Sequence, residues 1–287
     1  PMGFWDAVVG GRSVGTPGTP RLMEAAQARW GTADWPALFE DAIRLAEEGF
    51  AVSPRLAALV AADAERLSRF APTRDYFLPE GAPIAEGATL ANPAYAGTLR
   101  AIAEGGSAAF YTGAIADGIV ATVRNAPGNP GLLSTTDLAL YDVVERPAVC
   151  VEYRAHEVCG MGPPSSGALT VGQILGMLSG ADLAALGAEN PESWRLIGDA
   201  SRLAFADRGR YMADSDFVPV PVAGLVAPDY LAARFAPVLE AEAALESVAP
   251  GEPEFDHALL WADDVSIEFP STSHISIIDA AGNALSM

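Results

Sequence analysis

The spacing of apolar residues along most of the chain predicts helices. Apolar side chains recur every three or four residues, which is the period of a helix that buries one face. Ser134-Thr135-Thr136-Asp137 is typical of an N-terminal cap and predicts a short helical turn that reaches Tyr141. Longer helices are expected over residues 20–30, 36–50, 54–70, 94–104, 108–123, 166–178, 191–210 and 229–241.

Alternating apolar and polar residues predict a first hairpin. The ranges 148–153 and 156–161 flank Arg154-Ala155, so a two-residue turn would join them and pair Tyr153 with His156. Counting outward from this turn places Cys150 directly opposite Cys159, at a position where a disulfide is conceivable. Two small buried thiols are the simpler interpretation, and we favour it.

A second hairpin is expected at the C-terminal end of the printed sequence. Residues 273–279 alternate, Ala281-Gly282-Asn283 is a turn signal, and residues 284–287 begin a return strand. The stretch before this hairpin, residues 249–269, is poorly periodic and acidic, and we expect a solvated linker there. The predicted order is therefore helices, one hairpin, more helices, an acidic linker and a final strand pair.

Composition and charge narrow the classes of partner. Half of the 287 residues are apolar and mean hydropathy is +0.21, as in a globular chain with a large core. The net charge is −20 and no lysine occurs, which excludes nucleic acid as a partner because phosphate binding requires a basic face. We find no apolar run long enough to span a membrane.

The first residues, Pro1-Met2-Gly3, lack the basic start and long apolar stretch of a signal peptide. The sequence also stops in the middle of a predicted strand. We therefore expect the chain to be part of a longer gene product.

The candidate chemistry lies at the head of the second hairpin. Thr272 could act as a nucleophile if it were N-terminal, because its own α-amine, with a pKa of about 7.7–8.0, could accept the hydroxyl proton. That requires cleavage of the peptide bond between Ser271 and Thr272. On the local pattern alone, a plain hairpin is the simpler interpretation, since β-branched threonine is common in strands.

Three other groups of polar residues are weaker candidates. Ser165-Ser166-Gly167 precedes a predicted helix and could donate backbone N–H groups to an anion, although a Pro-Pro turn with a serine cap is simpler. Asp214 and Asp216 could bind a hard cation, but two carboxylates are few and a structural turn is simpler. The histidines, His156, His257 and His274, show no metal-ligand spacing.

Several segments in this order resemble those of the gamma-glutamyltransferase family, and together they cover nearly the whole chain. Thr272-Ser273-His274 is similar to the triplet that opens the family's small subunit. The others are Gly15-Thr16-Pro17-Gly18-Thr19, Trp30-Gly31-Thr32 with residues 42–46 and 49–52, Phe110-Tyr111-Thr112-Gly113 with Ile115-Ala116, Pro163-Pro164-Ser165-Ser166-Gly167, and Ala206-Asp207-Arg208 with Tyr211 and residues 214–218.

The resemblance implies an α+β fold, part of the four-layer αββα sandwich of N-terminal-nucleophile hydrolases. It implies autocatalytic cleavage between Ser271 and Thr272, with residues 1–271 in the large subunit, an acidic linker over about 249–271, and residues 272–287 as the first strands of the small subunit. Thr272 would be the catalytic nucleophile, and Ser273 and His274 would be candidate supporting residues.

The same resemblance implies transfer of a γ-glutamyl group from glutathione or related amides to water or an amino acid, through an acyl-Thr ester. No metal or organic cofactor is implied. The partners would be these small molecules and the two subunits of one precursor, in the periplasm or outside the cell.

Parts of the family's active site would lie outside the printed sequence. These are the arginine that binds the substrate carboxylate, a second threonine, the groups that hold the glutamyl moiety, and a glycine pair that forms the oxyanion hole. We therefore expect this chain alone to be inactive. Ser273 stands where many members of the family have threonine, and related amidases also have serine at this position. A β-lactam side-chain acylase or other amide acylase, and an unprocessed non-enzymatic relative, stay open as alternatives.

Overall fold

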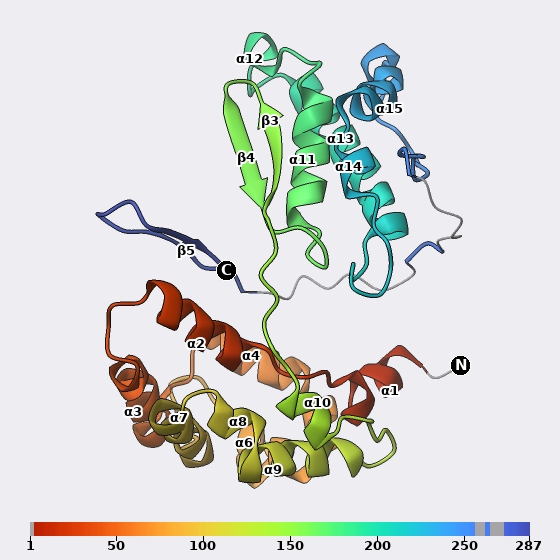
Figure 1. Cartoon of the computed structure of the whole chain (residues 1–287). Coiled ribbons are helices and arrows are strands. Elements are labelled where there is room, and N and C mark those ends of the chain that lie inside the picture. Colours follow the sequence, from red (N-terminus) through yellow and green to blue (C-terminus); the bar gives the residue numbers. More distant parts are fainter. Residues whose placement is uncertain (1–2, 256–261, 265–272) are drawn as a thin grey trace. The chain divides into compact units, whose positions relative to one another are not determined.

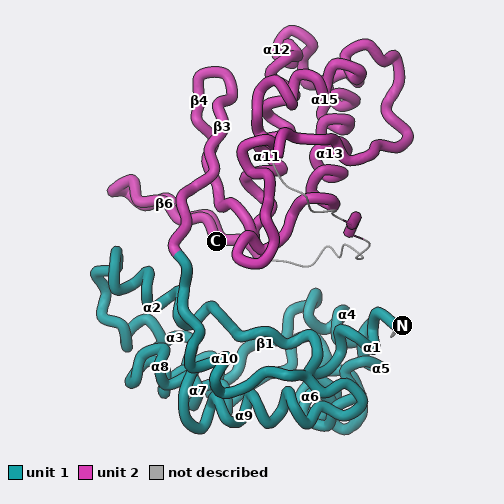
Figure 2. The backbone as a smooth tube through the Cα atoms, turned by 45° about the vertical axis from the view of Figure 1, so that its right-hand side comes forward, with its two compact units in different colours: residues 1–144 teal, residues 145–287 magenta. Residues whose placement is uncertain are grey.

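A computed structural model describes residues 3–255, 262–264 and 273–287 (Figure 1). The chain divides into two compact units, Pro1–Val144 and Glu145–Met287, which Figure 2 colours separately. Each unit has its own buried residues and is described here by itself. The Thr272 junction and its neighbour Ser271 fall outside the described residues.

The first unit is almost entirely helical. Its single sheet is a short pair of strands, β1 (Phe50–Ala51) and β2 (Thr89–Leu90). The helices and 3-10 turns are α1 (Phe4–Val8), η1 (Gly11–Ser13), α2 (Thr19–Trp30), η2 (Pro36–Phe39), α3 (Glu40–Glu48), α4 (Pro54–Ala62), α5 (Ala64–Leu67), α6 (Ala71–Phe77), η3 (Pro79–Gly81), α7 (Pro93–Gly105), α8 (Ala108–Tyr111), α9 (Gly113–Arg124) and α10 (Thr135–Ala139).

Two helices that the apolar spacing predicts as continuous are broken. The expected helix 54–70 is interrupted at Asp63, whose backbone leaves the helical region (φ −110°, ψ 11°), and it ends at Leu67. The expected helix 108–123 divides where Thr112 is extended and Gly113 takes a positive φ of 71°. The apolar period continues across both breaks, so periodicity alone does not reveal them.

The predicted cap before Tyr141 is confirmed and is reciprocal. The Ser134 hydroxyl accepts from the Asp137 backbone N–H, and the Asp137 carboxylate accepts from the Ser134 backbone N–H at 2.8 Å. The Ser134 hydroxyl also donates to the Asp137 carboxylate at 2.8 Å, and this hydrogen bond, together with the one from the Ser134 backbone, lowers the pKa of Asp137. The cap begins α10, whose Leu138 is fully buried.

Tyr111 joins two of the family-like segments inside the first unit. Its side chain is 1% exposed, and its hydroxyl donates to the Pro17 carbonyl at 2.6 Å and accepts from the Arg21 backbone N–H at 3.3 Å. Its ring stacks on that of Tyr141 with centroids 5.6 Å apart. Burial raises the pKa of Tyr111, so the hydroxyl stays protonated and able to donate. Both segments therefore contribute to the packing of this unit.

The second unit contains two hairpins and a helical layer. Its elements are β3 (Val149–Tyr153), β4 (His156–Gly160), α11 (Gly167–Leu178), α12 (Leu183–Leu186), α13 (Pro191–Tyr211), α14 (Val222–Leu225), α15 (Pro228–Glu240), β5 (Ser276–Ile278) and β6 (Ala284–Ser286). In Figure 1, α11 lies between the β3–β4 hairpin and α13. The main buried cluster comes from α11, α13 and α15 and contains Met177, Leu178, Leu196, Ala200, Leu203, Ala204, Leu231, Phe235 and Val238.

The predicted register of the first hairpin is confirmed. Tyr153 pairs with His156 and Cys150 pairs with Cys159. The preference for two buried thiols is wrong: the two cysteines form a disulfide, their Cα atoms lie 4.1 Å apart, and both residues are exposed. The reason is the orientation of the hairpin, because the opposite face, which includes Val151, packs against α11.

The described residues agree with the expected α+β class. Their strands form three separate two-stranded sheets, so the four-layer sandwich stays a prediction. Within the described ranges, every helix is either too short or too polar to cross a lipid bilayer.

Candidate functional site

The predicted hairpin after the Thr272 junction is confirmed. Strand β5 pairs with β6 in the register Ser276 to Ser286, and Ile275 and Met287 exchange two backbone hydrogen bonds of 2.7 and 3.0 Å. The described part of this hairpin begins at Ser273, one residue after Thr272. Thr272 therefore lies four positions before the start of β5 in the sequence.

The turn of this hairpin is held by one carboxylate. Asp279 accepts hydrogen bonds from the Ala281 backbone at 2.9 Å and from the backbone and side chain of Asn283, each at 2.8 Å. The hydrogen bonds from Asn283 are the main reason that the pKa of Asp279 is lowered. Asp279 is therefore an acceptor with a structural task, because it holds the turn that joins β5 and β6.

Of the two candidate supporting residues, His274 has a defined partner. Its Nε2 atom lies 2.8 Å from the Ser276 hydroxyl, and Ser273, His274 and Ser276 are all exposed. A supporting role for either residue stays a prediction.

The segment that leads toward the junction is anchored by one buried carboxylate. Asp207, in α13, is 1% exposed and accepts four hydrogen bonds. The donors are Gln173 of α11 at 2.9 Å, Tyr230 of α15 at 2.6 Å, Arg234 of α15 at 3.1 Å, and the Gly251 backbone N–H at 2.7 Å. Burial and the hydrogen bond to Asp207 raise the pKa of Tyr230, which keeps its hydroxyl protonated.

Further contacts hold the acidic segment to α13 and α15. The Tyr211 hydroxyl donates to the Gly251 carbonyl at 2.7 Å, and Arg234 donates to the carbonyl of Ala249. Further along, Arg210 pairs with Asp263, and the Asp264 N–H donates to the Gly209 carbonyl at 2.7 Å. These positions are therefore tied to α13 and α15 by hydrogen bonds, while Ala249 and residues 262–264 are exposed, and the linker as a whole stays a prediction. The remainder, residues 256–261 and 265–271, lies outside the described residues.

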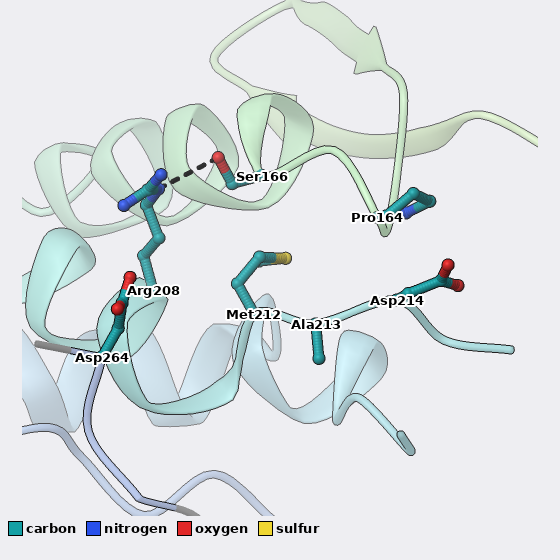
Figure 3. Close-up of a pocket in the computed structure, with 7 residues that line it drawn as sticks. All are labelled: Pro164, Ser166, Arg208, Met212, Ala213, Asp214 and Asp264. Atoms are coloured by element: carbon teal, nitrogen blue, oxygen red, sulfur yellow. Dashed lines mark hydrogen bonds between the residues drawn. The ribbon is translucent and has the colours of Figure 1, made fainter. Parts of the chain in front are cut away.

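A polar cavity of about 250 Å³ lies beside this anchored segment (Figure 3). Arg208 donates from Nε to the Ser166 hydroxyl at 3.1 Å. Figure 3 shows Met212 and Ala213 between Arg208 and Asp214. The full lining is Pro164, Ser166, Arg208, Met212, Ala213, Asp214 and Asp264. The cavity thus offers a guanidinium, a hydroxyl and two carboxylates, which could bind a small polar molecule.

The cavity brings together segments that sequence reasoning treated separately. Pro163 and Pro164 are joined by a cis peptide bond and form the expected turn before α11. Ser166 occupies the N-cap position of α11 as expected, but its hydroxyl accepts from Arg208 and makes no capping hydrogen bond. The pairing of Ser166 with Arg208 spans 42 positions and has no local signal.

The interpretation of Asp214 and Asp216 as a turn is confirmed. The Asp214 carboxylate accepts from the Asp216 backbone N–H at 3.0 Å, and the Asp216 carboxylate pairs with Arg146 at 2.6 Å. The hydrogen bond from Arg146 lowers the pKa of Asp216. Both carboxylates therefore have structural partners.

Comparisons with known proteins cover nearly the whole chain. The family model described as gamma-glutamyltranspeptidase matches residues 2–287. A glutathione hydrolase proenzyme of Bacillus subtilis (strain 168) is 32% identical over 289 residues, which cover 99% of this chain and 48% of that protein. An acylase ACY 1 proenzyme of Pseudomonas sp. (strain SE83) is 33% identical, covering 97% of this chain and 47% of that protein.

A solved structure is similar as well. The crystal structure of Helicobacter pylori gamma-glutamyltranspeptidase aligns with a TM-score of 0.81 and 33% identity, over 87% of this chain and 71% of that chain. The chain spans about half the length of the curated relatives that it matches.

Proposed function

This chain belongs to the gamma-glutamyltranspeptidase family, of the N-terminal-nucleophile hydrolases, and on that basis we propose that the full-length protein transfers γ-glutamyl groups. The donors would be glutathione and related γ-glutamyl amides, and the acceptors would be water or an amino acid. The observation that carries the proposal is the Thr272-Ser273-His274 triplet immediately before the β5–β6 hairpin, in a chain that matches the family from residue 2 to residue 287.

The proposed chemistry has two stages that use one hydroxyl. In the first, the Thr272 hydroxyl attacks the Ser271 carbonyl, so that the peptide bond becomes an ester and the Thr272 amine is freed. Water then hydrolyses that ester, which releases the Ser271 carboxylate and restores the Thr272 hydroxyl. In the second, this amine accepts the hydroxyl proton while the oxygen attacks the γ-carbonyl of the donor. The donor's amine leaves with a proton, and water or an acceptor amine then attacks the acyl-Thr ester and restores the hydroxyl.

The cellular setting is proposed to be the periplasm or the exterior of the cell. The Cys150–Cys159 disulfide supports this, because disulfides persist in oxidising compartments and are rare in the cytosol. The partner of the large-subunit part would be the small subunit released from the same precursor.

Expression of the full-length precursor tests the processing step. We expect two bands on a denaturing gel after incubation, and N-terminal sequencing of the smaller product should begin Thr-Ser-His-Ile, from Thr272. A single uncut band after prolonged incubation, or a smaller product with another N-terminus, would contradict the proposed cleavage between Ser271 and Thr272.

A second candidate function is favoured by the acylase relative, whose identity to this chain is as high as that of the glutathione hydrolase. In this alternative, Thr272 would again be the nucleophile, and the substrate would be the side-chain amide of a β-lactam or another amide. The difference lies in whether the site recognises the α-amino group of a γ-glutamyl donor.

Two anilides that differ only in this group separate the candidates. We expect the processed protein to prefer γ-glutamyl anilide over glutaryl anilide by at least about 100-fold in kcat/KM. A site with buried groups that pair with the α-ammonium rejects an analogue that lacks it. Equal rates, or a preference for the glutaryl anilide, would favour the acylase. The absence of turnover with either, in an uncut chain, would favour a non-enzymatic relative.

A further inference from the structure

One face of the β3–β4 hairpin brings two sulfur atoms and a carboxylate together. The register pairs Cys150 with Cys159 and Glu152 with Glu157, so these four side chains lie on the same face. All four residues are exposed. The sulfur atoms of Cys150 and Cys159 and a carboxylate oxygen of Glu157 lie within 4.8 Å of one another. They are the one such group of three or more metal-ligand side chains among the residues that the structure describes.

From this arrangement we propose that the hairpin holds a redox-gated site for a thiophilic divalent cation such as Zn²⁺. Cys150 and Cys159 would be the sulfur ligands, and Glu157 would supply an oxygen. Two thiolates, one carboxylate and a water molecule complete the tetrahedral set that Zn²⁺ prefers. The proposal does not depend on γ-glutamyl transfer, because it involves only the hairpin and the helix beneath it.

The gate is the disulfide itself. While Cys150 and Cys159 are bonded, neither sulfur can act as a thiolate ligand. Two equivalents of a small thiol open the bond by exchange: the protein gains two thiols and the small thiol leaves as its own disulfide. The cation then replaces the two thiol protons, which are released to solvent.

Packing on the other face keeps the ligands close after the disulfide opens. Val149, Val151 and Val158 are half-buried on that face, and the hairpin packs against α11. Gly172 of α11 allows this approach, since a Cβ atom there would lie 2.8 Å from Val151 Cγ1. The disulfide joins residues only nine positions apart, so it restricts the unfolded chain less than a long-range bridge would. The reduced hairpin is therefore expected to retain its register.

Charge on the site face favours a cation. Glu152 adds a second carboxylate opposite Glu157. The arginine of the hairpin turn, Arg154, lies with its guanidinium carbon 5.0 Å from the centre of the Tyr153 ring. Tyr153 pairs with His156 on the face opposite the cysteines, so this positive charge is directed away from the sulfur atoms.

Zinc titration of the 287-residue chain in its two redox states tests the site. The chain is reduced with a phosphine, and Zn²⁺ binding is measured by competition with a chromogenic indicator. We expect the reduced chain to bind one Zn²⁺ and the oxidised chain to bind at least 100-fold more weakly. Cys150→Ser and Cys159→Ser should each weaken the reduced chain's binding by a similar factor, and Glu157→Gln should weaken it about 10-fold.

His156→Asn is the matched control, because His156 is a ligand-type residue of the same hairpin on the opposite face. Its affinity for Zn²⁺ should stay within about twofold of the reduced parent. A Cys150→Ser/Cys159→Ser double variant, examined by amide hydrogen exchange, shows whether the hairpin folds without the bridge.

Four results would overturn the proposal. They are equal zinc binding by the oxidised and reduced chains, retained binding in either single cysteine variant, an effect of His156→Asn as large as that of Glu157→Gln, and loss of amide protection in β3 and β4 of the double variant.

Discussion

Replacing Thr272 by alanine in the full-length precursor should abolish both self-cleavage and turnover. Both proposed steps need the same hydroxyl, first for attack on the Ser271 carbonyl and then for attack on the donor amide. Removal of a covalent nucleophile typically lowers kcat by a factor on the order of 10⁴ or more. Denaturing gels should therefore show one uncut chain, and release of the chromophore from a γ-glutamyl anilide should not exceed background.

Two further variants make this result specific. Thr272→Ser keeps the hydroxyl and loses the methyl group that restricts its rotamer, so it should cleave and turn over more slowly, by roughly 10- to 100-fold. Thr122→Ala makes the same chemical change as Thr272→Ala at an exposed position of α9 and should be processed normally. Cleavage and turnover by Thr272→Ala at the normal rate would show that another residue is the nucleophile.

The register of the first hairpin was predictable from local sequence. A strand has a period of two residues, and a two-residue turn at Arg154-Ala155 leaves one register that pairs Tyr153 with His156. The position of Cys150 opposite Cys159 follows by counting. Which face of the hairpin would be buried does not follow, because it depends on contact with α11, and this is why the interpretation of buried thiols failed.

Helix boundaries were predictable where a side chain supplies the cap and unpredictable where the backbone breaks. The α10 cap follows from Ser134 and Asp137, which are three positions apart. The break at Thr112 and Gly113 has no such marker, since the apolar period continues from α8 into α9. A glycine within a helical pattern is compatible with both a continuous and a broken helix.

The candidate site also has one part that is predictable from local sequence and one part that is not. The junction triplet at Thr272 is a contiguous motif, so the sequence alone is sufficient to propose it as a candidate, and it stays a prediction. The Asp207 network is not contiguous: its partners in α11 and α15 and at Gly251 are 23 to 44 positions away. The segment Ala206-Asp207-Arg208 resembles a segment of the family. The structural role of Asp207, however, follows only from the packing of α11, α13 and α15.

Because of that structural role, replacing Asp207 should strongly destabilise the second unit. Asp207→Asn keeps the shape of the side chain but exchanges one acceptor oxygen for an NH₂ donor. The donors that meet Oδ2, from Gln173 and Tyr230, would then face another donor, and Arg234 would lose its charged partner. Removing one partner of a buried ion pair typically costs about 3–5 kcal/mol.

Amide hydrogen exchange measures this loss unit by unit. A cost of about 3 kcal/mol corresponds to exchange that is roughly 100-fold faster for the most protected amides, since 1.4 kcal/mol is a factor of about 10. We expect this acceleration in α11, α13 and α15, while α7 and α9 of the first unit keep their rates. Glu240→Gln makes the equivalent change at an exposed carboxylate of α15 and should stay within about 0.5 kcal/mol of the parent.

The pattern of exchange also separates a local role from a general one. Asp207 binds the Gly251 backbone, so Asp207→Asn should release the start of the acidic segment together with the helices. Faster exchange at Gly251 alone, with α11, α13 and α15 unchanged, would show that Asp207 only tethers that segment. Equal acceleration in both units would show that the loss spreads beyond the packing contacts of Asp207. The network is essential to the fold of the second unit only if its three helices lose protection together and the first unit does not.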